Sequence, residues 1–392
     1  MSAAKGLAER LKEIESQGLT RRRKTLTTPQ GVSVILDGRP LLNFSSNDYL
    51  GLANHPRVVA ALKRGASAFG VGSGASHLIC GHSMPHEQLE EALAAFTGRE
   101  RALLFSTGYM ANLGVVDTLV GRGGIIFEDR LNHASLLDGA RLSGAKLKRY
   151  PHGSVPSLSS VEGQLIASDG VFSMEGDTAD VLGLSEVALQ AGAYLMIDDA
   201  HGLGVLGDTG AGLLESLGVG QEEVPILMGT FGKSFGTFGA FVAGQKDLID
   251  YLLQRARTAI YTTALPPALA VATMASLALI QDEGWRRLHL RQLIERLRQG
   301  AADLGLPLMR SESPIQPFLL GSPLVATALA DHLLMRGFLV TAIRPPTVPR
   351  GLARLRVTLT AGHTINQVDH LLEAMSDGFR ALPSPLLDDL TQ

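Results

Sequence analysis

Short hydrophobic runs alternate with segments of helical periodicity over residues 87–243. The runs predict buried strands, and the segments between them repeat apolar residues every three or four positions, as in helices covered on one side. Strands that alternate with helices are typical of a mostly parallel sheet with helices on both faces. The sequence therefore predicts a three-layer α/β/α fold. The predicted strands cover 102–105, 125–127, 165–167, 194–197, 225–228 and 240–243, and the clearest helices cover 87–96 and 110–119.

The pattern changes after residue 243, where the helical segments become longer. Helices are predicted over 248–261 and 268–281, with the Pro266-Pro267 pair between them. An apolar stripe that starts at Trp285 leads into a smaller α/β unit. The strands of this unit are predicted near 315–320, 338–342 and 352–359, and its helices over 326–336 and from 365 onward.

The N-terminal segment precedes the regular alternation. Residues 1–28 read as an amphipathic helix followed by the basic run Arg21–Lys24, and two short strands then flank Asp37-Gly38, a hairpin turn signal. The basic run is either a solvated tail or an arm that brings an arginine to an anionic substrate. We expect three units: a helix and arm over 1–45, a large domain over 46–284 and a small domain over 285–392.

Composition limits the kinds of function. The 392 residues are 45% hydrophobic and carry a net charge of −3, so no overall positive field would attract nucleic acid. The single Cys80 excludes a disulfide framework within the chain and fits a reducing compartment. Residues 1–24 lack the apolar core of a signal peptide, and the apolar stretch 268–280 is too short to span a bilayer. We therefore expect a cytoplasmic protein with no membrane or nucleic-acid partner.

Reactive side chains follow the ends of the predicted strands. Ligands of open α/β sheets bind beyond the carboxyl ends of the strands. Lys233 lies in a glycine-flanked loop between two apolar runs, where an amine of lowered pKa could form a Schiff base. Several reactive residues share this position beyond the strand ends, which favours one common site over separate structural roles. The residues placed there are Ser106, Asp198, His201 and Lys233, with His133 just beyond another strand.

Pyridoxal 5'-phosphate (PLP) fits this set of groups. Lys233 would form the Schiff base, and Asp198 would pair with the pyridine nitrogen so that the ring acts as an electron sink. The turn of Ser106, Gly108 and Tyr109 opens a helix and, with Thr230, would hold the phosphate. His201 and Ser173 would hydrogen-bond the ring oxygen, and His133 would stack on the ring.

Three other interpretations, a hydrolase triad, a metal site and a dinucleotide site, fit less well. A triad of Ser173, Asp198 and His201 is conceivable, but the chain has no Gly-x-Ser-x-Gly elbow. His133 and His201 lack a local ligand spacing, so we expect no metal in this site. The glycine-rich stretch 70–74 follows a predicted helix rather than a strand, which argues against a dinucleotide fingerprint.

Five motifs give the chain a specific resemblance. It resembles the α-oxoamine synthases, PLP enzymes of the aspartate-aminotransferase-like fold type I, over nearly its whole length. The motifs are Asn43–Leu52, Asn132–Ser135, Ser173–Asp177, Asp198–Gly202 and Thr230–Lys233. The segment Thr341–Pro349 resembles most closely the branch that joins L-alanine to a pimeloyl thioester, either pimeloyl-CoA or pimeloyl-acyl carrier protein.

The resemblance implies further residue roles. Lys233 would remove the Cα proton of the amino acid, and His133 would meet the substrate as well as the ring. Arg21 and Thr347 would contact the acyl substrate, whereas Asn47 and Arg356 would contact the carboxylate of the amino acid. The family is a homodimer, in which Thr262 would reach the phosphate of the neighbouring subunit.

Some alternatives stay open at this stage. A sister enzyme would use glycine with a short acyl thioester, and substrate choice rests on a few pocket residues. An inactive partner subunit would be expected to lack Lys233. The arginines of the strand 354–359 could form a solvent-facing row, or Arg356 could face a cleft and bind a carboxylate. His77 stands where an arginine is common in the family.

Overall fold

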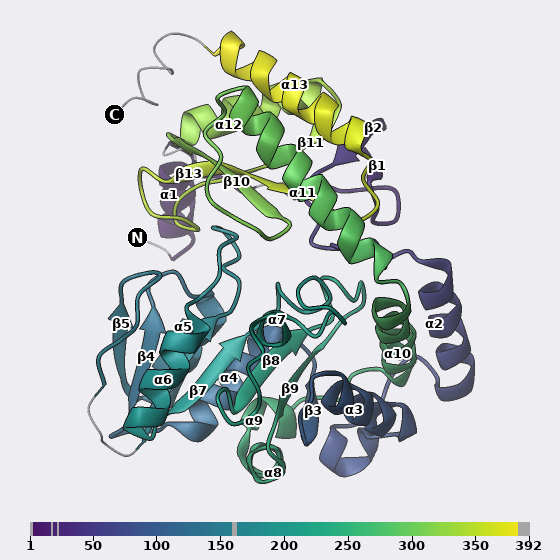
Figure 1. The fold of residues 1–392 in the computed structure, drawn as a ribbon, viewed down its shortest axis with the longest axis vertical. Coiled ribbons are helices and arrows are strands. Elements are labelled where there is room, and N and C mark those ends of the chain that lie inside the picture. The colour runs from purple at the N-terminus through teal and green to yellow at the C-terminus, as the bar shows by residue number, and fades with distance from the viewer. Residues whose placement is uncertain (1–2, 17–18, 22, 159–162, 383–392) are drawn as a thin grey trace.

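The structure is a computed structural model that describes residues 3–16, 19–21, 23–158 and 163–382. Figure 1 shows two parts, a lower one built on a large sheet and an upper one that holds α12 (Pro323–Met335), α13 (Ile365–Ala381) and the N-terminal hairpin. The helix α11 (Trp285–Asp303) runs from one part to the other. Its first residue coincides with the proposed start of a small domain.

The large sheet has seven strands in the order β3-β9-β8-β7-β6-β4-β5. Neighbouring strands of this sheet are parallel, except that β9 is antiparallel to both β3 and β8. All six strands predicted for this region are present, and β5 was missed because its charged residues hide an edge strand. The bounds are Arg101–Phe105 (β3), Ile125–Asp129 (β4), Lys146–Tyr150 (β5), Gln164–Asp169 (β6), Tyr194–Asp198 (β7), Ile226–Thr230 (β8) and Ala240–Gly244 (β9).

Helices cover both faces of this sheet, as the alternation predicts. Successive side chains of a strand point to opposite faces. Met196 of β7 accordingly packs with α4 and α5, whereas Leu195 and Ile197 pack with α6 and α7. The helix bounds are Pro56–Phe69 (α2), Met84–Phe96 (α3), Gly108–Leu119 (α4), Ala134–Ser143 (α5), Val181–Ala191 (α6), Leu213–Leu217 (α7), Lys246–Arg255 (α8), Arg257–Ile260 (α9) and Pro267–Asp282 (α10).

One predicted helix is broken in the structure, and one pair of helices packs unusually closely. The predicted helix over 248–261 is two helices, because the buried Ala256 is extended and breaks the run between α8 and α9. The helices α2 and α10 approach closely, since a Cβ added to Gly65 would lie 2.8 Å from the Ala268 Cα. Glycine is therefore required at this crossing.

The upper part has two small sheets. In one, β10 (Ile315–Gly321) and β12 (Thr341–Ile343) pair antiparallel with β13 (Ala353–Thr358). In the other, β1 (Ser33–Leu36) and β2 (Arg39–Asn43) form the predicted hairpin, and β11 (Phe338–Leu339) pairs in parallel with β2. The predicted single strand over 338–342 is wrong, because the chain passes from one sheet to the other at the buried Val340.

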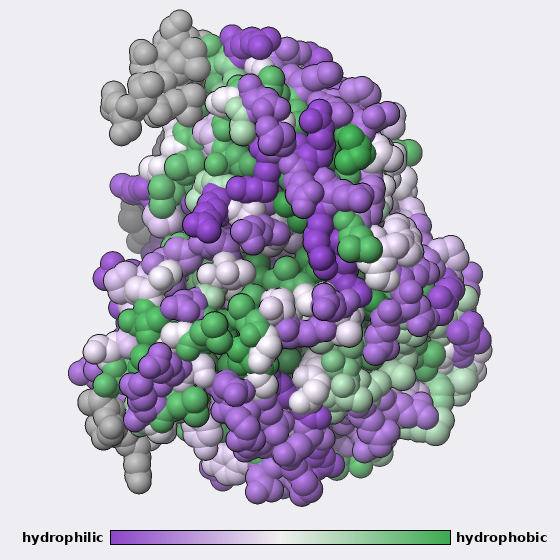
Figure 2. Space-filling model, in the orientation of Figure 1, coloured by the Kyte–Doolittle hydropathy of each residue, from purple (hydrophilic) through white to green (hydrophobic). Residues whose placement is uncertain are grey.

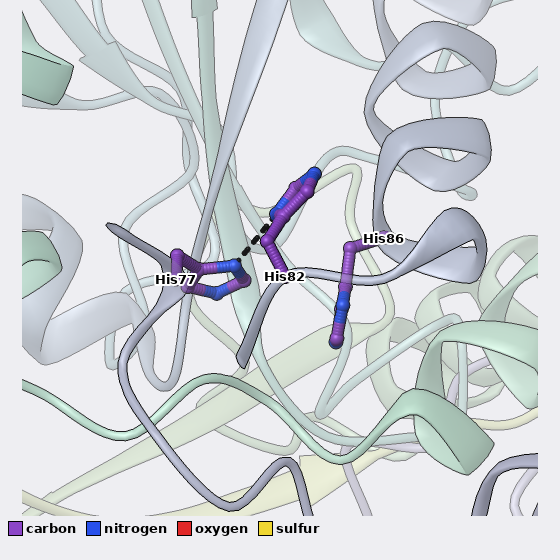
Figure 3. A group of neighbouring side chains, drawn as sticks. All are labelled: His77, His82 and His86. Atoms are coloured by element: carbon purple, nitrogen blue, oxygen red, sulfur yellow. Dashed lines mark hydrogen bonds between the residues drawn. The ribbon is translucent and has the colours of Figure 1, made fainter. Parts of the chain in front are cut away.

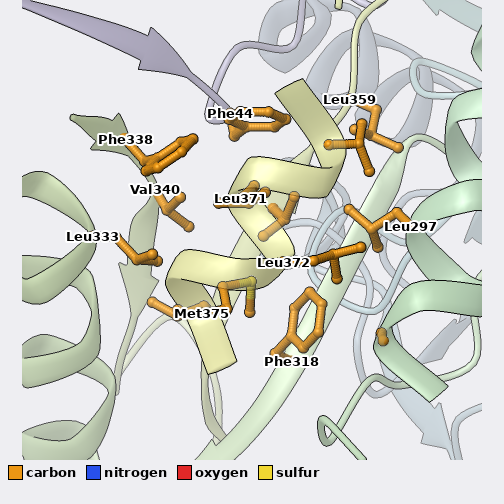
Figure 4. Close-up of a cluster of buried hydrophobic side chains, with 14 of the residues drawn as sticks. Phe44, Leu297, Phe318, Leu333, Phe338, Val340, Leu359, Leu371, Leu372 and Met375 are labelled. Carbon is orange, nitrogen blue, oxygen red and sulfur yellow. The ribbon is translucent and has the colours of Figure 1, made fainter. Parts of the chain in front are cut away.

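In the core of the upper part, residues that follow the N-terminal hairpin pack against the C-terminal helix α13. Figure 4 shows Phe44 beside Phe338, with Leu371, Leu372 and Met375 of α13 below them. Phe44 also stacks on His363, with ring centroids 4.1 Å apart. The N-terminal helix α1 (Ala3–Ser16) is present as predicted.

The surface shown in Figure 2 is mostly hydrophilic, with hydrophobic residues in separate groups. Within the described residues, the helices are either too short or too polar to cross a membrane.

Candidate active site

The predicted reactive residues meet in a cavity of about 390 Å³ between the two parts of the molecule. The cavity lies at the carboxyl ends of β6, β7 and β8, as expected for an open α/β sheet. Residues predicted from the sequence account for much of its lining: Asn47, Gly108, Tyr109, His133, Ser173, Asp198, His201, Thr230, Lys233 and Arg356.

Lys233 is held by a tightly packed loop between β8 and β9. The neighbouring Phe231 and Phe235 are fully buried, and the Gly236 N–H donates to the Lys233 carbonyl over 2.8 Å. Gly236 has a φ of +65°, and a Cβ there would lie 2.3 Å from the Ala53 backbone nitrogen. Removal from water lowers the pKa of Lys233, and the nearby Asp198 and Asp169 oppose that shift. The loop thus presents an amine that deprotonates more readily than an exposed lysine.

The two adjacent aspartates point in opposite directions. Asp198 lines the cavity and accepts hydrogen bonds from Asn112 Nδ2 at 2.7 Å and from the Ala200 N–H at 3.0 Å. Asp199 accepts instead from the Leu213 N–H at 2.7 Å, and burial raises its pKa to about 8. Asp198 is therefore the carboxylate available to a ligand in the cavity.

Both cavity histidines are neutral at neutral pH. His133 Nδ1 accepts from the Ser135 N–H at 3.3 Å, which leaves the ring proton on Nε2. His201 Nδ1 lies 2.6 Å from the hydroxyl of the buried Tyr49. Burial is the main cause that lowers the pKa of each histidine, strongly so for His201.

Arg356 reaches the cavity from the small sheet. Both arginines of β13 are buried, with exposed fractions of 1% for Arg354 and 7% for Arg356, so they are not a solvent-facing row. The Nε of Arg356 donates to the Ser173 carbonyl at 2.7 Å, and its Nη1 donates to Asn47 Oδ1 at 3.1 Å. Arg354 pairs with Glu175 at 2.9 Å. These contacts fix a guanidinium at the boundary of the two parts.

Sequence reasoning missed two residues of the cavity lining, Asp169 and Asn112, and also Tyr49, which contacts the lining residue His201. Asp169 accepts from the His133 N–H at 2.7 Å, and burial beside Asp198 raises its pKa well above the ordinary value. Asn112 is fully buried and joins Ser135 to Asp198. Tyr49 orients His201. For Asn112, the available signal was an amide among apolar residues of a helix; for Asp169, it was a carboxyl at a strand end.

Several predicted residues lie outside this cavity. Ser106 borders it, with its Oγ 3.4 Å from the Thr263 carbonyl. Thr347 lies on an exposed turn, where its N–H donates to the Arg344 carbonyl at 3.1 Å. Arg21 is exposed, and Arg22 of the basic run lies outside the described residues. Thr262 lies in a short strip, residues 261–264, which pairs with Ser76 through Thr263.

A second cavity of about 510 Å³ meets the first at Lys233. The two share Ser45, Asn47 and Thr341 in their linings. The second cavity is also lined by Lys24, which belongs to the basic run. Because Lys233 lines both cavities, they offer space for two substrates next to one amine.

The residues present fit PLP. The first N–H groups of α4, at Gly108 and Tyr109, face the cavity and are suited to an anion such as a phosphate. Asp198 supplies a fixed negative charge for a protonated ring nitrogen, and Lys233 supplies an amine for the aldehyde. These polar groups and the size of the cavity together match a small phosphorylated ring.

His152 bridges two aspartates, and this contact predicts that the stability of the fold depends on pH. His152 lies 3.1 Å from Asp129 and 3.0 Å from Asp177, and these bonds raise its pKa from 6.5 to about 10. The folded pKa exceeds the unfolded one, so the stabilisation is complete below pH 6.5 and lost between 6.5 and 10. His152→Gln should lower the free energy of unfolding by about 1–2 kcal/mol at pH 6.5 and much less at pH 9.5, as measured by urea unfolding.

The exposed His370 on α13 provides the control for this prediction. His370→Gln should change the free energy of unfolding little at either pH. An equal loss at both pH values for His152→Gln would show that the charge on His152 does not stabilise the fold.

Comparison with known proteins gives the relatives of the chain. Residues 39–375 match the family of class I and II aminotransferases. The chain is 58% identical to the 8-amino-7-oxononanoate synthase of Pseudomonas aeruginosa (strain LESB58), over 98% of this chain and 97% of that protein. It is 56% identical to the synthase of the same name from Cellvibrio japonicus (strain Ueda107), over 95% of each chain.

Solved structures agree with this relationship. A serine palmitoyltransferase from S. paucimobilis, described with bound PLP–myriocin, matches with a TM-score of 0.90 and 30% identity, over 96% of this chain and 97% of that one. The 8-amino-7-oxononanoate synthase of Francisella tularensis matches with a TM-score of 0.77 and 31% identity, over 87% of this chain and 98% of that one.

Proposed function

Since the chain belongs to the class I and II aminotransferases and, within them, to the 8-amino-7-oxononanoate synthases, we propose that it joins L-alanine to a pimeloyl thioester. A bond forms between the alanine Cα and the thioester carbonyl carbon, and the thiol of coenzyme A or acyl carrier protein leaves. The alanine carboxylate leaves as CO2, and a proton returns to Cα. The product is 8-amino-7-oxononanoate, a compound of biotin biosynthesis. The observation that carries this proposal is the junction of two cavities at Lys233.

The cofactor is PLP, which when bound stabilises negative charge at the amino acid Cα. We propose that Lys233 holds its aldehyde carbon and that Asp198 pairs with its ring nitrogen. His133 would lie on the ring face, and His201 and Ser173 would hydrogen-bond the ring oxygen. The phosphate would bind at the start of α4, with Ser106, Gly108, Tyr109 and Thr230 as its ligands. The cavity lining supports these roles, apart from Ser106, which borders it.

Lys233 also serves as the base at Cα. With PLP bound, the free Lys233 amine would lie beside the Cα of alanine, where it would take the Cα proton. The lowered pKa of Lys233 keeps more of the amine unprotonated than in an exposed lysine, which suits a general base near neutral pH. The same group can return the proton to Cα after CO2 has left.

Arg356 and Asn47 would bind the carboxylate of alanine. The guanidinium is fixed by the Ser173 carbonyl and by Asn47, so it keeps its orientation before the substrate arrives. A guanidinium matches a carboxylate with two parallel hydrogen bonds. The neutral His133 Nε2–H is placed to donate a hydrogen bond to a substrate oxygen in the same cavity.

The second cavity would receive the acyl chain. Pimeloyl ends in a carboxylate several carbons from its thioester, and this carboxylate needs a cation away from Lys233. Lys24 lines this cavity, whereas the exposed Arg21 and Thr347 are not among its lining residues in the part of the chain that the structure describes. We therefore propose Lys24 as a further contact of the acyl carboxylate, beside the Arg21 and Thr347 contacts that the family resemblance implies.

A comparison of substrates tests the function. Pimeloyl thioester with L-alanine should have the highest kcat/KM among the four combinations of pimeloyl or acetyl thioester with L-alanine or glycine. A charge-assisted contact contributes roughly 1.5–3 kcal/mol, or about a ten- to hundredfold preference for pimeloyl. Lys24→Ala should narrow this preference mainly by slowing the pimeloyl reaction, and Arg21→Ala serves as its matched comparison.

The outcomes separate the alternatives. A higher kcat/KM for acetyl thioester with glycine would assign the protein to a glycine C-acetyltransferase-like activity. If only Arg21→Ala narrows the preference, the acyl carboxylate binds the arginine and not Lys24. If neither variant does, the basic run is a solvated tail.

We also propose that the protein is a homodimer in which Thr262 reaches the phosphate site of the partner. Exposed apolar side chains near this strip support an interface, namely Val71, Ile79, Met84 and Tyr261, which are 61–85% exposed. Contact with a second chain would remove these apolar side chains from water. Light scattering of the holoenzyme should give twice the chain mass, and a fully active monomer would contradict the proposal.

The free and exposed Cys80 supports a cytoplasmic location.

A further inference from the structure

Three histidines form a cluster separate from the Lys233 cavity. Figure 3 shows His77, from the single π-helical turn η1 (His77–Gly81), beside His82 and His86, the latter in the first turn of α3. Their ring centroids lie 5.0–5.4 Å apart. One nitrogen from each ring can be chosen so that all three nitrogens lie within 4.8 Å of one another.

The hydrogen bonds of the cluster indicate which nitrogens carry lone pairs. His86 Nε2 lies 2.5 Å from the Leu265 carbonyl, which can only accept, so the proton is on Nε2 and Nδ1 has the lone pair. His82 Nε2 lies 3.0 Å from the Glu87 carboxylate, which likewise leaves its Nδ1 as the acceptor. His77 Nδ1 lies 2.8 Å from this His82 Nδ1 and donates to it.

This arrangement is the one that metal-binding histidines adopt. Such histidines usually donate their other ring N–H to a carboxylate or a backbone carbonyl, which fixes the ring and its tautomer. His82 has the carboxylate of Glu87, and His86 has the carbonyl of Leu265. His77 needs only to move its proton from Nδ1 to Nε2 to present a third lone pair.

Two of the rings, His77 and His86, take up an extra proton less readily than a free imidazole. Burial and the neighbouring rings lower the pKa of His77 to about 4, and burial also lowers the pKa of His86. A zinc ion with Zn–N bonds near 2.0–2.1 Å separates its nitrogens by about 3.3 Å, so the His77–His82 pair must open by only about 0.5 Å.

We propose that His77, His82 and His86 bind one zinc ion per chain, with Glu87 orienting His82. Three imidazoles suit zinc and its neighbours copper and nickel rather than magnesium or calcium. His77 and His82 line a cavity of about 460 Å³ together with Glu87 and Glu90, which leaves room for a fourth ligand such as water. The His82 side chain is 30% exposed, so the ion has an entry path.

Ligation of His86 has one local consequence. Its Nδ1 now accepts from the Ser83 N–H at 3.0 Å, as part of the capping box that begins α3. The ion takes over this lone pair, while the Ser83 side chain still caps the backbone of His86. The ion would then tie η1 to α3, and through Leu265 to the strip where Thr263 pairs with Ser76.

The test is zinc titration of the tag-free, PLP-loaded protein after treatment with a chelator. We expect about one zinc per chain by calorimetry and metal analysis, together with a higher thermal unfolding temperature. His77→Ala and His82→Ala should each weaken binding by about 100-fold or more, and Glu87→Gln by about 10- to 100-fold. The exposed His370→Ala should bind zinc like the unchanged protein.

The absorbance of bound PLP shows independently that each variant is folded, which matters for His86→Ala because His86 caps α3. His77 and His82 are more accessible, so their variants decide the result. No stoichiometric zinc binding, or unchanged affinity in both the His77→Ala and His82→Ala proteins, would overturn the proposal.

Discussion

Replacing Lys233 with alanine is expected to reduce kcat by roughly 10⁴-fold or more, because one side chain both holds the cofactor and moves the Cα proton. The lysine lies where the two cavities meet, so removal of its amine affects the site of each substrate. Among the described residues that line the first cavity, Lys233 is the only lysine, so no second amine there can replace it. Steady-state assays with L-alanine and pimeloyl thioester measure the loss.

A second readout separates a chemical loss from a folding loss. Borohydride should attach PLP covalently to the peptide that contains Lys233 in the unchanged protein and not in Lys233→Ala, as seen by mass spectrometry. Lys63→Ala, on an exposed turn of α2, should keep both the attachment and the activity. Ordinary turnover by Lys233→Ala would show that this lysine is not the base.

Replacing Asp198 with asparagine should lower kcat by about 10²- to 10³-fold. The asparagine keeps the size of the side chain and can still accept from the Ala200 N–H, but it removes the negative charge that faces the cavity. Without that charge, the ring nitrogen of PLP holds its proton less firmly, and each pKa unit corresponds to about 1.4 kcal/mol. The retained PLP absorbance should show that the cofactor still binds.

Asp199→Asn is the matched control. Asp199 turns away from the cavity, and its raised pKa of about 8 makes it a neutral carboxyl at pH 7. An asparagine there can still accept from the Leu213 N–H, so kcat should change by less than about threefold. If Asp199→Asn loses activity while Asp198→Asn keeps it, the assignment of the two aspartates is reversed.

Much of the large sheet could be predicted because its strands are buried on both faces. Such strands form continuous apolar runs, as in 226–228 and 240–243, and these are easy to recognise. The edge strand β5 has one exposed side, and its lysines and arginine obscure it. The division of 338–343 between two sheets depends on β2, hundreds of residues earlier, and no local pattern contains that information.

The candidate site was predictable where topology alone brings residues together. Asp198 and Lys233 follow adjacent strands, so the sheet places them side by side. Asp169 and Asn112 were missed because their importance comes from contacts with His133 and Asp198. Lys24 was missed for a similar reason, since the fold of the arm, rather than any motif, brings it to the second cavity.

The pairing of β2 with β11 imposes an order on synthesis of the chain. The Ser45 hydroxyl bonds to the Leu339 carbonyl, 294 residues away. At roughly 5–20 residues per second, a ribosome needs about 15–60 s to deliver that partner. During this interval the hairpin of β1 and β2 has an open edge, while the seven-stranded sheet, complete at residue 244, can already form. The β1–β2 hairpin is therefore made early and is among the last segments to find its neighbour, and its open edge is exposed to pairing with other chains while the chain emerges.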